Sequence, residues 1–228
     1  DGKLKMAQQK IDSADLKLNA AGINLDEKLT PALGKLADYY TKAAPAGTFD
    51  LDFDKIKLYK DENGEKGLLL DGTIMLNNCS IGQNKPISDI YAICDIDAEY
   101  KFAGGLEKCR LFLNFQNIAI KDRPINNLKL PVVIDTNENK IIVENFVGDF
   151  LGGKISGSAV IETDKNSKFS QYQIDMAMAN VNTESFVSPK TAEKTPGQTN
   201  AELRIRGDFQ NPQTAMGRFI AEAKGIKP

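Results

Sequence analysis

The feature that most constrains the fold of this chain is a long period-two alternation of apolar and charged side chains. From position 90 to 102 every second residue is apolar or small, and Asp95, Asp97, Glu99 and Lys101 stand between them. Successive side chains of a β-strand point to opposite faces of the sheet. The run therefore predicts a long strand with one apolar face and one wet face.

The same alternation returns at 172–178 and at 201–209. Short segments rich in Asn, Asp and Gly separate the alternating runs, at 61–64, 137–140 and 164–167. Such segments favour tight hairpin connections between antiparallel strands. We therefore expect a mainly β fold, an elongated, curved antiparallel sheet of roughly ten to fourteen strands.

One segment has helical spacing instead. Leu33, Leu36 and Tyr40 recur at three- and four-residue intervals, behind a Thr30-Pro31 pair typical of a helix start. This spacing predicts one main α-helix near residues 31–43, with those three side chains packed against the sheet.

The domain organisation follows from these elements. No shift in composition divides the chain, so residues 1–228 are expected to form a single β-rich segment, with a strand and helix region at 1–47 and the sheet at 48–228. A polar stretch with two prolines predicts a long loop at about 187–199. Because the sequence starts at Asp1 without an initiator Met, we interpret it as part of a larger protein.

Composition excludes several functions. The 29 Lys and Arg against 31 Asp and Glu give a net charge of −2, which lacks the basic surplus that nucleic acid binding requires. The chain has no His, so it lacks the usual general base near neutral pH and the commonest metal ligand. Cys79, Cys94 and Cys109 show no C-x-x-C spacing, and we expect dispensable free thiols.

Two motifs suggest ligand chemistry. Gly148 to Lys154 matches part of a phosphate-binding loop, but Ile155 stands where a magnesium-binding Ser or Thr is required, so a turn or bulge between strands is favoured. Asp50, Asp52 and Asp54 share a strand face where they could hold calcium, and a solvated face explains them equally well.

Catalytic pairs are not visible in the sequence, and no enzyme activity, metal or cofactor is predicted. Arg204 and Arg206 share a strand face with Glu202 and Asp208, which indicates a mixed wet surface. The candidate site is instead apolar. Its predicted lining residues are Ile90, Ala92, Cys94, Ile96, Ile155, Ala159, Ile161, Tyr172, Ile174, Met176, Met178, Leu203 and Ile205.

Four segments carry a resemblance to a known family: 152–161, 172–182, 199–209 and 216–219, with glycines at the ends of alternating strands. Together with the Pro45-Ala46-Gly47 opening of the next strand, they resemble the C-terminal region of AsmA-like proteins over about residues 25–225. One departure is that Ala215 or Met216 stands where the family commonly has a glycine.

The resemblance implies a non-enzymatic protein of a two-membrane bacterium, on the periplasmic side of the cell envelope. It implies anchoring in the inner membrane through a segment outside this chain, and repeated β-sheets forming an apolar groove. The implied partner is phospholipid or another acyl lipid, and the implied function is its transport between inner and outer membranes. The alternative is a scaffold for outer-membrane biogenesis that contacts other envelope proteins. Whether the apolar rows line an open groove or a closed core stays open.

Overall fold

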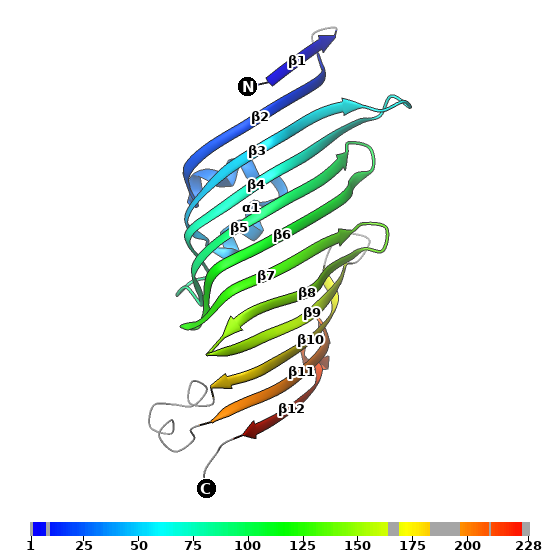
Figure 1. Cartoon of the computed structure of the whole chain (residues 1–228). Coiled ribbons are helices and arrows are strands. Elements are labelled where there is room, and N and C mark those ends of the chain that lie inside the picture. Colours follow the sequence, from blue (N-terminus) through cyan, green and yellow to red (C-terminus); the bar gives the residue numbers. More distant parts are fainter. Residues whose placement is uncertain (1, 8–9, 164–168, 183–196, 210, 225–228) are drawn as a thin grey trace. The chain divides into compact units, whose positions relative to one another are not determined.

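The computed structural model describes residues 2–7, 10–163, 169–182, 197–209 and 211–224. It is mainly β and antiparallel, which confirms the predicted fold class, and its twelve strands in the described residues fall within the expected number. The chain divides into two compact units, 1–122 and 123–228. Each unit is an antiparallel meander in which a strand pairs with the next strand in sequence (Figure 1).

Unit 1 contains the first six strands, and their pairing follows their order in the chain. Their bounds are β1 (Gly2–Ala7), β2 (Lys10–Asn24), β3 (Ala46–Lys60), β4 (Lys66–Ile81), β5 (Ile87–Lys101) and β6 (Gly105–Ile120). The long alternating run predicted as one strand is β5.

Unit 2 contains the other six strands, again paired in order. They are β7 (Arg123–Asp135), β8 (Lys140–Phe150), β9 (Gly153–Thr163), β10 (Phe169–Asn182), β11 (Gln198–Asp208) and β12 (Met216–Lys224), with a short 3-10 turn, η3 (Pro212–Thr214), before the last strand. Most of the predicted loop at 187–199 lies outside the described residues, and its last two positions belong to β11.

The predicted helix is present, but only its second half is α-helical. A 3-10 segment, η1 (Glu27–Leu36), precedes α1 (Ala37–Ala43). The segment begins at Asp26, not at Thr30, because the Asp26 carboxylate accepts the Lys28 backbone N–H at 2.9 Å. Gly34, at φ 52° and ψ −120°, interrupts the helical backbone between the two halves.

The helical segment is fixed to unit 1 by backbone hydrogen bonds at both ends. Leu25 N donates to Gly47 O at 3.0 Å, and Gly82 N donates to Ala43 O at 2.7 Å. Within the segment, the Tyr40 hydroxyl donates to Asp26 O at 3.1 Å. Figure 1 shows the segment on one side of the sheet of unit 1. The predicted contacts of Leu33 and Leu36 lie outside the described side chains.

The hairpin turns use the residues that the sequence indicates. Asp61 accepts the backbone N–H of Asn63 and of Glu65 at 2.9 Å, which closes the β3–β4 turn. Leu151 and Gly152 have φ of 48° and 79°, and this two-residue turn with positive φ at both positions matches the twist of a hairpin. The segment 164–167, also predicted as a turn, lies outside the described residues.

Bulges interrupt the pairing at positions that adopt a left-handed backbone. In unit 1, Gly22, Asn78 and Asp89 have φ of 67°, 50° and 53°, and each lies at a shift of register between neighbouring strands. In unit 2, Asn127 and Asn180 also have positive φ, and each lies at a shift of register. Asn, Asp and Gly tolerate this conformation best, so the extra residue of each bulge is accommodated where such residues occur.

Aromatic rings in unit 2 lie over glycines of the neighbouring strand. A Cβ added to Gly157 would come within 2.7 Å of the Phe146 ring and 2.1 Å of Asp175 O. A Cβ on Gly207 would lie within 2.5 Å of the Tyr172 hydroxyl. The glycines leave room for the rings, and the rings cover backbone that would otherwise be bare.

This packing predicts that Gly157→Ala destabilises the protein by about 2 kcal/mol, because both the ring and a strand backbone must move. Gly217→Ala is the matched control. Gly217 lies on β12, the last strand of unit 2, and the atom nearest to its added Cβ would be Arg204 O at 3.2 Å. That change should alter the free energy of unfolding by less than about 1 kcal/mol. Urea denaturation of both variants measures the difference, and equal stabilities would contradict the packing argument.

Candidate functional site

The sheet of unit 1 carries apolar side chains in register across five strands, β2 to β6. Cross-strand pairing places them in rows: Ala14, Leu58, Leu68, Tyr100 and Leu106; Leu16, Ile56, Leu70, Ala98 and Cys109; Leu18, Phe53, Gly72, Ile96 and Leu111; Ala20, Leu51, Ile74, Cys94 and Leu113; Ile23, Phe49, Leu76, Ala92 and Phe115. We call this surface the unit 1 apolar face. Its rows follow adjacent strands, so it is continuous across the sheet.

Only one end of the unit 1 apolar face is closed by protein. Cys79, Ile90 and Ala92 are 2–4% exposed and form a cluster against which Leu25, next to the helical segment, is packed. Farther along the strands the small side chains of Ala98 and Cys109 are buried, most of the larger side chains are half-buried, and Leu18 remains 40% exposed. A second layer therefore covers the helical end, whereas much of the remaining face is only partly shielded by its own neighbours.

Unit 2 has an equivalent surface, the unit 2 apolar face. Its rows are Ile134, Ile141, Ile161, Tyr172 and Gly207; Val132, Val143, Ala159, Ile174, Ile205 and Gly217; Phe146, Gly157, Met176, Leu203 and Phe219; Gly148, Ile155, Met178, Ala201 and Ala221. Most of these side chains are half-buried, and Phe219 is 62% exposed. The last row is partly enclosed, since Ile155 and Ala201 are 9% and 4% exposed, and the extensive contacts among the described elements of unit 2 run between neighbouring strands and between β11 and η3.

The structure places the sequence-predicted lining residues on these two faces. The nine in unit 2 lie in four adjacent rows, and Met176 pairs directly with Leu203. The four in unit 1 lie on one face of β5. Ile90 and Ala92 belong to the closed cluster, however, so they are enclosed by protein side chains, while Cys94 and Ile96 are half-buried.

Sequence reasoning missed the contribution of β3, β4, β6 and β8. In β3, apolar residues occur at Leu51 and Phe53 and then at Ile56 and Leu58, so the alternation changes phase. The structure shows the cause, a shift of register between Phe53 and Lys55. The step of three residues within an alternating run is the signal that could have identified this bulge.

The opposite faces of both sheets are mainly polar and carry exposed ion pairs. Lys17 lies 3.0 Å from Asp54, Lys108 pairs with Asp97, and Lys154 pairs with Asp149. Exposed pairs of this kind contribute about 0–1 kcal/mol each to the free energy of unfolding. Their main effect is therefore to keep this face hydrated. Exposed apolar side chains such as Ile93, Phe112 and Val147 also occur on these opposite faces, so the two faces of each sheet differ chiefly in their content of charged residues.

Two of the three candidate calcium ligands, Asp50 and Asp54, have protein partners. Both Asp50 oxygens accept hydrogen bonds, from Gly22 N at 2.7 Å and from the Asn77 amide at 3.1 Å, and Asp54 pairs with Lys17. The Asp50 carboxylate thus holds the bulge at Gly22. Within the described residues, no group of three or more His, Cys, Asp or Glu side chains is arranged to hold a metal ion.

The glycine-rich segment at 148–154 is a hairpin between β8 and β9, as its structural interpretation predicts. Lys154 pairs with Asp149 across this turn, and Asn127 donates to the other Asp149 oxygen at 2.7 Å. These partners lower the pKa of Asp149, with the Asn127 hydrogen bond as the largest cause. The lysine that a phosphate-binding loop would use is therefore engaged with a carboxylate.

All three cysteines are free thiols with raised pKa values. Burial is the largest cause in each case, and it is supplemented at Cys94 by the negative charge of Asp95, so that its pKa rises to about 11. Cys79 is the most enclosed, and its Sγ donates to Thr48 O at 3.2 Å. Protonated thiols are poor nucleophiles, so these residues behave as apolar side chains.

Comparison with protein-family models, with curated proteins and with solved structures finds no match for this chain. Among the described residues, the helices are too short and too polar to cross a bilayer.

The raised pKa predicts slow alkylation of Cys94. At pH 8 a thiol with a pKa of about 11 has roughly 100-fold less thiolate than an unperturbed one, and the rate follows the thiolate. Mass spectrometry after iodoacetamide treatment of a Cys79→Ala, Cys109→Ala protein measures this rate. Asp95→Asn should speed the reaction, because it removes the negative charge that is the second cause of the raised Cys94 pKa. Alkylation of the folded protein as fast as in urea would contradict the assignment.

Proposed function

We propose that this chain is a non-enzymatic segment of a cell-envelope protein whose apolar faces bind the acyl chains of phospholipid. The observation that supports this proposal is the unit 2 apolar face, four rows of apolar side chains in register, most of which are only half-buried. A contiguous exposed apolar surface of this kind marks a place where something apolar binds. The resemblance to AsmA-like proteins supports the same conclusion.

The dimensions of the unit 2 apolar face fit an acyl chain. Four rows two residues apart extend roughly 20 Å along the strands, at about 3.3 Å per residue. One leaflet of hydrocarbon is about 15 Å thick, so a lipid tail lying along a strand can be shielded over its length. Each methylene of the tail that is buried contributes about 0.8 kcal/mol. Binding is therefore favoured even when the face covers only part of the tail.

The composition of the rows suits a ligand without fixed shape. Met176 and Met178 lie on β10 in the middle of the face, flanked by Leu203 and Ile155 in the neighbouring strands. Methionine is flexible and polarisable, so it adapts to tails of different length and unsaturation. Gly217 lowers the surface beside Ile205, while the Phe146 ring lies over Gly157. This mixture indicates lipid binding with little selectivity for the tail.

Charge placed on this face tests the proposal. Met176→Arg and Ile205→Arg should abolish co-purifying phospholipid in native mass spectrometry, and their melting temperatures should fall little because the half-buried guanidinium can reach water. Ala177→Arg is the matched control, since Ala177 is exposed on the opposite face of the same strand and should retain lipid. Unfolding of both Met176→Arg and Ile205→Arg would show that the face is a closed core.

Ile90→Arg provides the contrast for a closed position. Ile90 is 2% exposed, so an arginine there leaves an unpaired buried charge and should destabilise the protein by several kcal/mol.

Lipid-free wild-type protein under every purification condition would count against lipid binding altogether.

A second candidate function, an assembly scaffold, is favoured by β12. This strand pairs with β11 along one edge, and the described residues provide no partner for its other edge. Its side chains include Met216 at 76% exposed and Phe219 at 62% exposed. A bare strand edge with exposed apolar side chains can accept a strand from another protein.

The scaffold function makes its own prediction. The double variant Met216→Lys, Ile220→Lys leaves the unit 2 apolar face unchanged. It should prevent recovery of envelope proteins in a pull-down, because charged side chains on an edge oppose strand addition. If lipid still co-purifies with this variant, the edge and the apolar face have separate functions. Unchanged recovery of partners would remove the support that β12 gives to a scaffold.

A further inference from the structure

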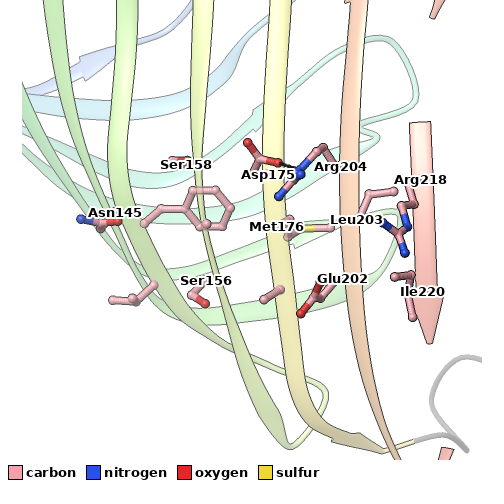
Figure 2. Close-up of a pocket in the computed structure, with 14 residues that line it drawn as sticks. Asn145, Ser156, Ser158, Asp175, Met176, Glu202, Leu203, Arg204, Arg218 and Ile220 are labelled. Carbon is pink, nitrogen blue, oxygen red and sulfur yellow. Dashed lines mark hydrogen bonds and ion pairs between the residues drawn. The ribbon is translucent and has the colours of Figure 1, made fainter. Parts of the chain in front are cut away.

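The polar face of unit 2 carries a row of interacting charges that the sequence does not reveal. Ser158, Asp175, Arg204 and Arg218 stand opposite one another on β9, β10, β11 and β12. They line a shallow open depression of about 500 Å³, together with Ser156 and Glu202 (Figure 2). The sequence puts Arg204 beside acidic neighbours, and only the strand register shows that Arg218 lies opposite it.

Arg204 is neutralised within the protein. Its Nε donates to Asp175 Oδ1 at 2.5 Å, and Gln173 donates to the other Asp175 oxygen at 2.7 Å. These two hydrogen bonds, with Gln173 as the first cause, lower the pKa of Asp175 and keep it ionised. Figure 2 shows Arg204 turned toward Asp175, on the neighbouring strand. The negative charge of Asp175 is thus committed to Arg204.

Arg218 is left with an unfavourable neighbourhood. Like charges directly opposite on antiparallel strands repel each other, and Arg218 stands opposite Arg204 with Arg206 two positions farther along. Within the described residues, the Arg218 side chain has no ion pair or hydrogen bond. Glu202 lies in the adjacent row, opposite Ile220, and it makes no ion pair with Arg218.

The remaining polar groups of the depression are suited to an oxyanion. The hydroxyls of Ser156 and Ser158 and the amide of Asn145 line it, and none of them has a hydrogen-bond partner among the described residues. A guanidinium presents parallel N–H donors that match two oxygens of a phosphate. The hydroxyls can donate to a third oxygen.

We propose that this depression binds a phosphate group, with Arg218 as the principal ligand. A bound phosphate would offset the repulsion between the opposed arginines. The group could belong to a soluble phosphate compound or to a lipid headgroup, since both present the same oxygens. Because the depression is on the face opposite the unit 2 apolar face, the proposal does not depend on acyl chain binding.

Calorimetric titration with inorganic phosphate at constant ionic strength tests the site, with chloride titrated as the control anion. Arg218→Gln should weaken the affinity by at least about tenfold, and Arg218→Lys by less, because it keeps the charge but loses the bidentate geometry. Glu202→Gln should strengthen it by removing a nearby negative charge. Arg218 is exposed on the edge strand, so the melting temperatures of all three variants should match wild type.

The two sources of phosphate are separated by a second arm. Vesicles of phosphatidylglycerol and micelles of an uncharged detergent are compared for wild type, Arg218→Gln and Ile205→Arg, because Ile205 lies on the unit 2 apolar face and does not line the depression. Inorganic phosphate binding that needs Arg218 and survives Ile205→Arg supports a soluble ligand. Binding that needs Arg218 but occurs only with phosphatidylglycerol supports a headgroup. The proposal is overturned if neither inorganic phosphate nor phosphatidylglycerol binds, if binding is insensitive to Arg218→Gln, or if Glu202→Gln weakens it, since a carboxylate beside a bound anion should only oppose binding.

Discussion

The strand register is the constraint on which the rest of this structure depends. Few side chains are fully enclosed, and apart from the cluster around Cys79 and Ile90 the strands contact mainly their sheet neighbours. Stability must therefore come chiefly from backbone ladders and cross-strand side-chain pairs, each worth a fraction of a kcal/mol. A slip of one residue would turn every apolar side chain of a strand to the wet face. Cooperation among many weak pairs keeps the faces distinct.

The bulges protect this register while bending the strands. An extra residue in an alternating strand would reverse the faces beyond it, unless the residue is absorbed locally. Gly22, Asn78 and Asp89 absorb it with a left-handed backbone, and Asp50 holds the first of them through the Gly22 N–H. In unit 1 these three bulges flank the same row, the one that contains Phe49. The strands can thus bend at a common level without loss of the apolar face.

Sequence alone was sufficient for the fold class and for the strands with unbroken alternation, such as β5, β10 and β11, because period two identifies a strand face directly. It was insufficient for the helix start, where the Asp26 side chain, and not Thr30, satisfies the first backbone N–H groups. It also could not assemble the apolar faces, since the phase change in β3 hides two of its residues. The opposition of Arg204 and Arg218 depends on the pairing of β11 with β12, which no local pattern encodes.

A sheet one strand thick places two surfaces of different chemistry back to back. Met176 and Leu203 lie on the apolar face, and Asp175 and Arg204, the adjacent residues on the same two strands, lie on the polar face. Side chains on one face can therefore be substituted without altering those on the other, although both faces depend on the same backbone hydrogen bonds. A phospholipid whose tail lay on the unit 2 apolar face could bring its phosphate to Arg218 only around the free edge of β12. If a neighbouring strand paired with that edge, the route would close, so strand addition at β12 and headgroup access to Arg218 compete for the same edge.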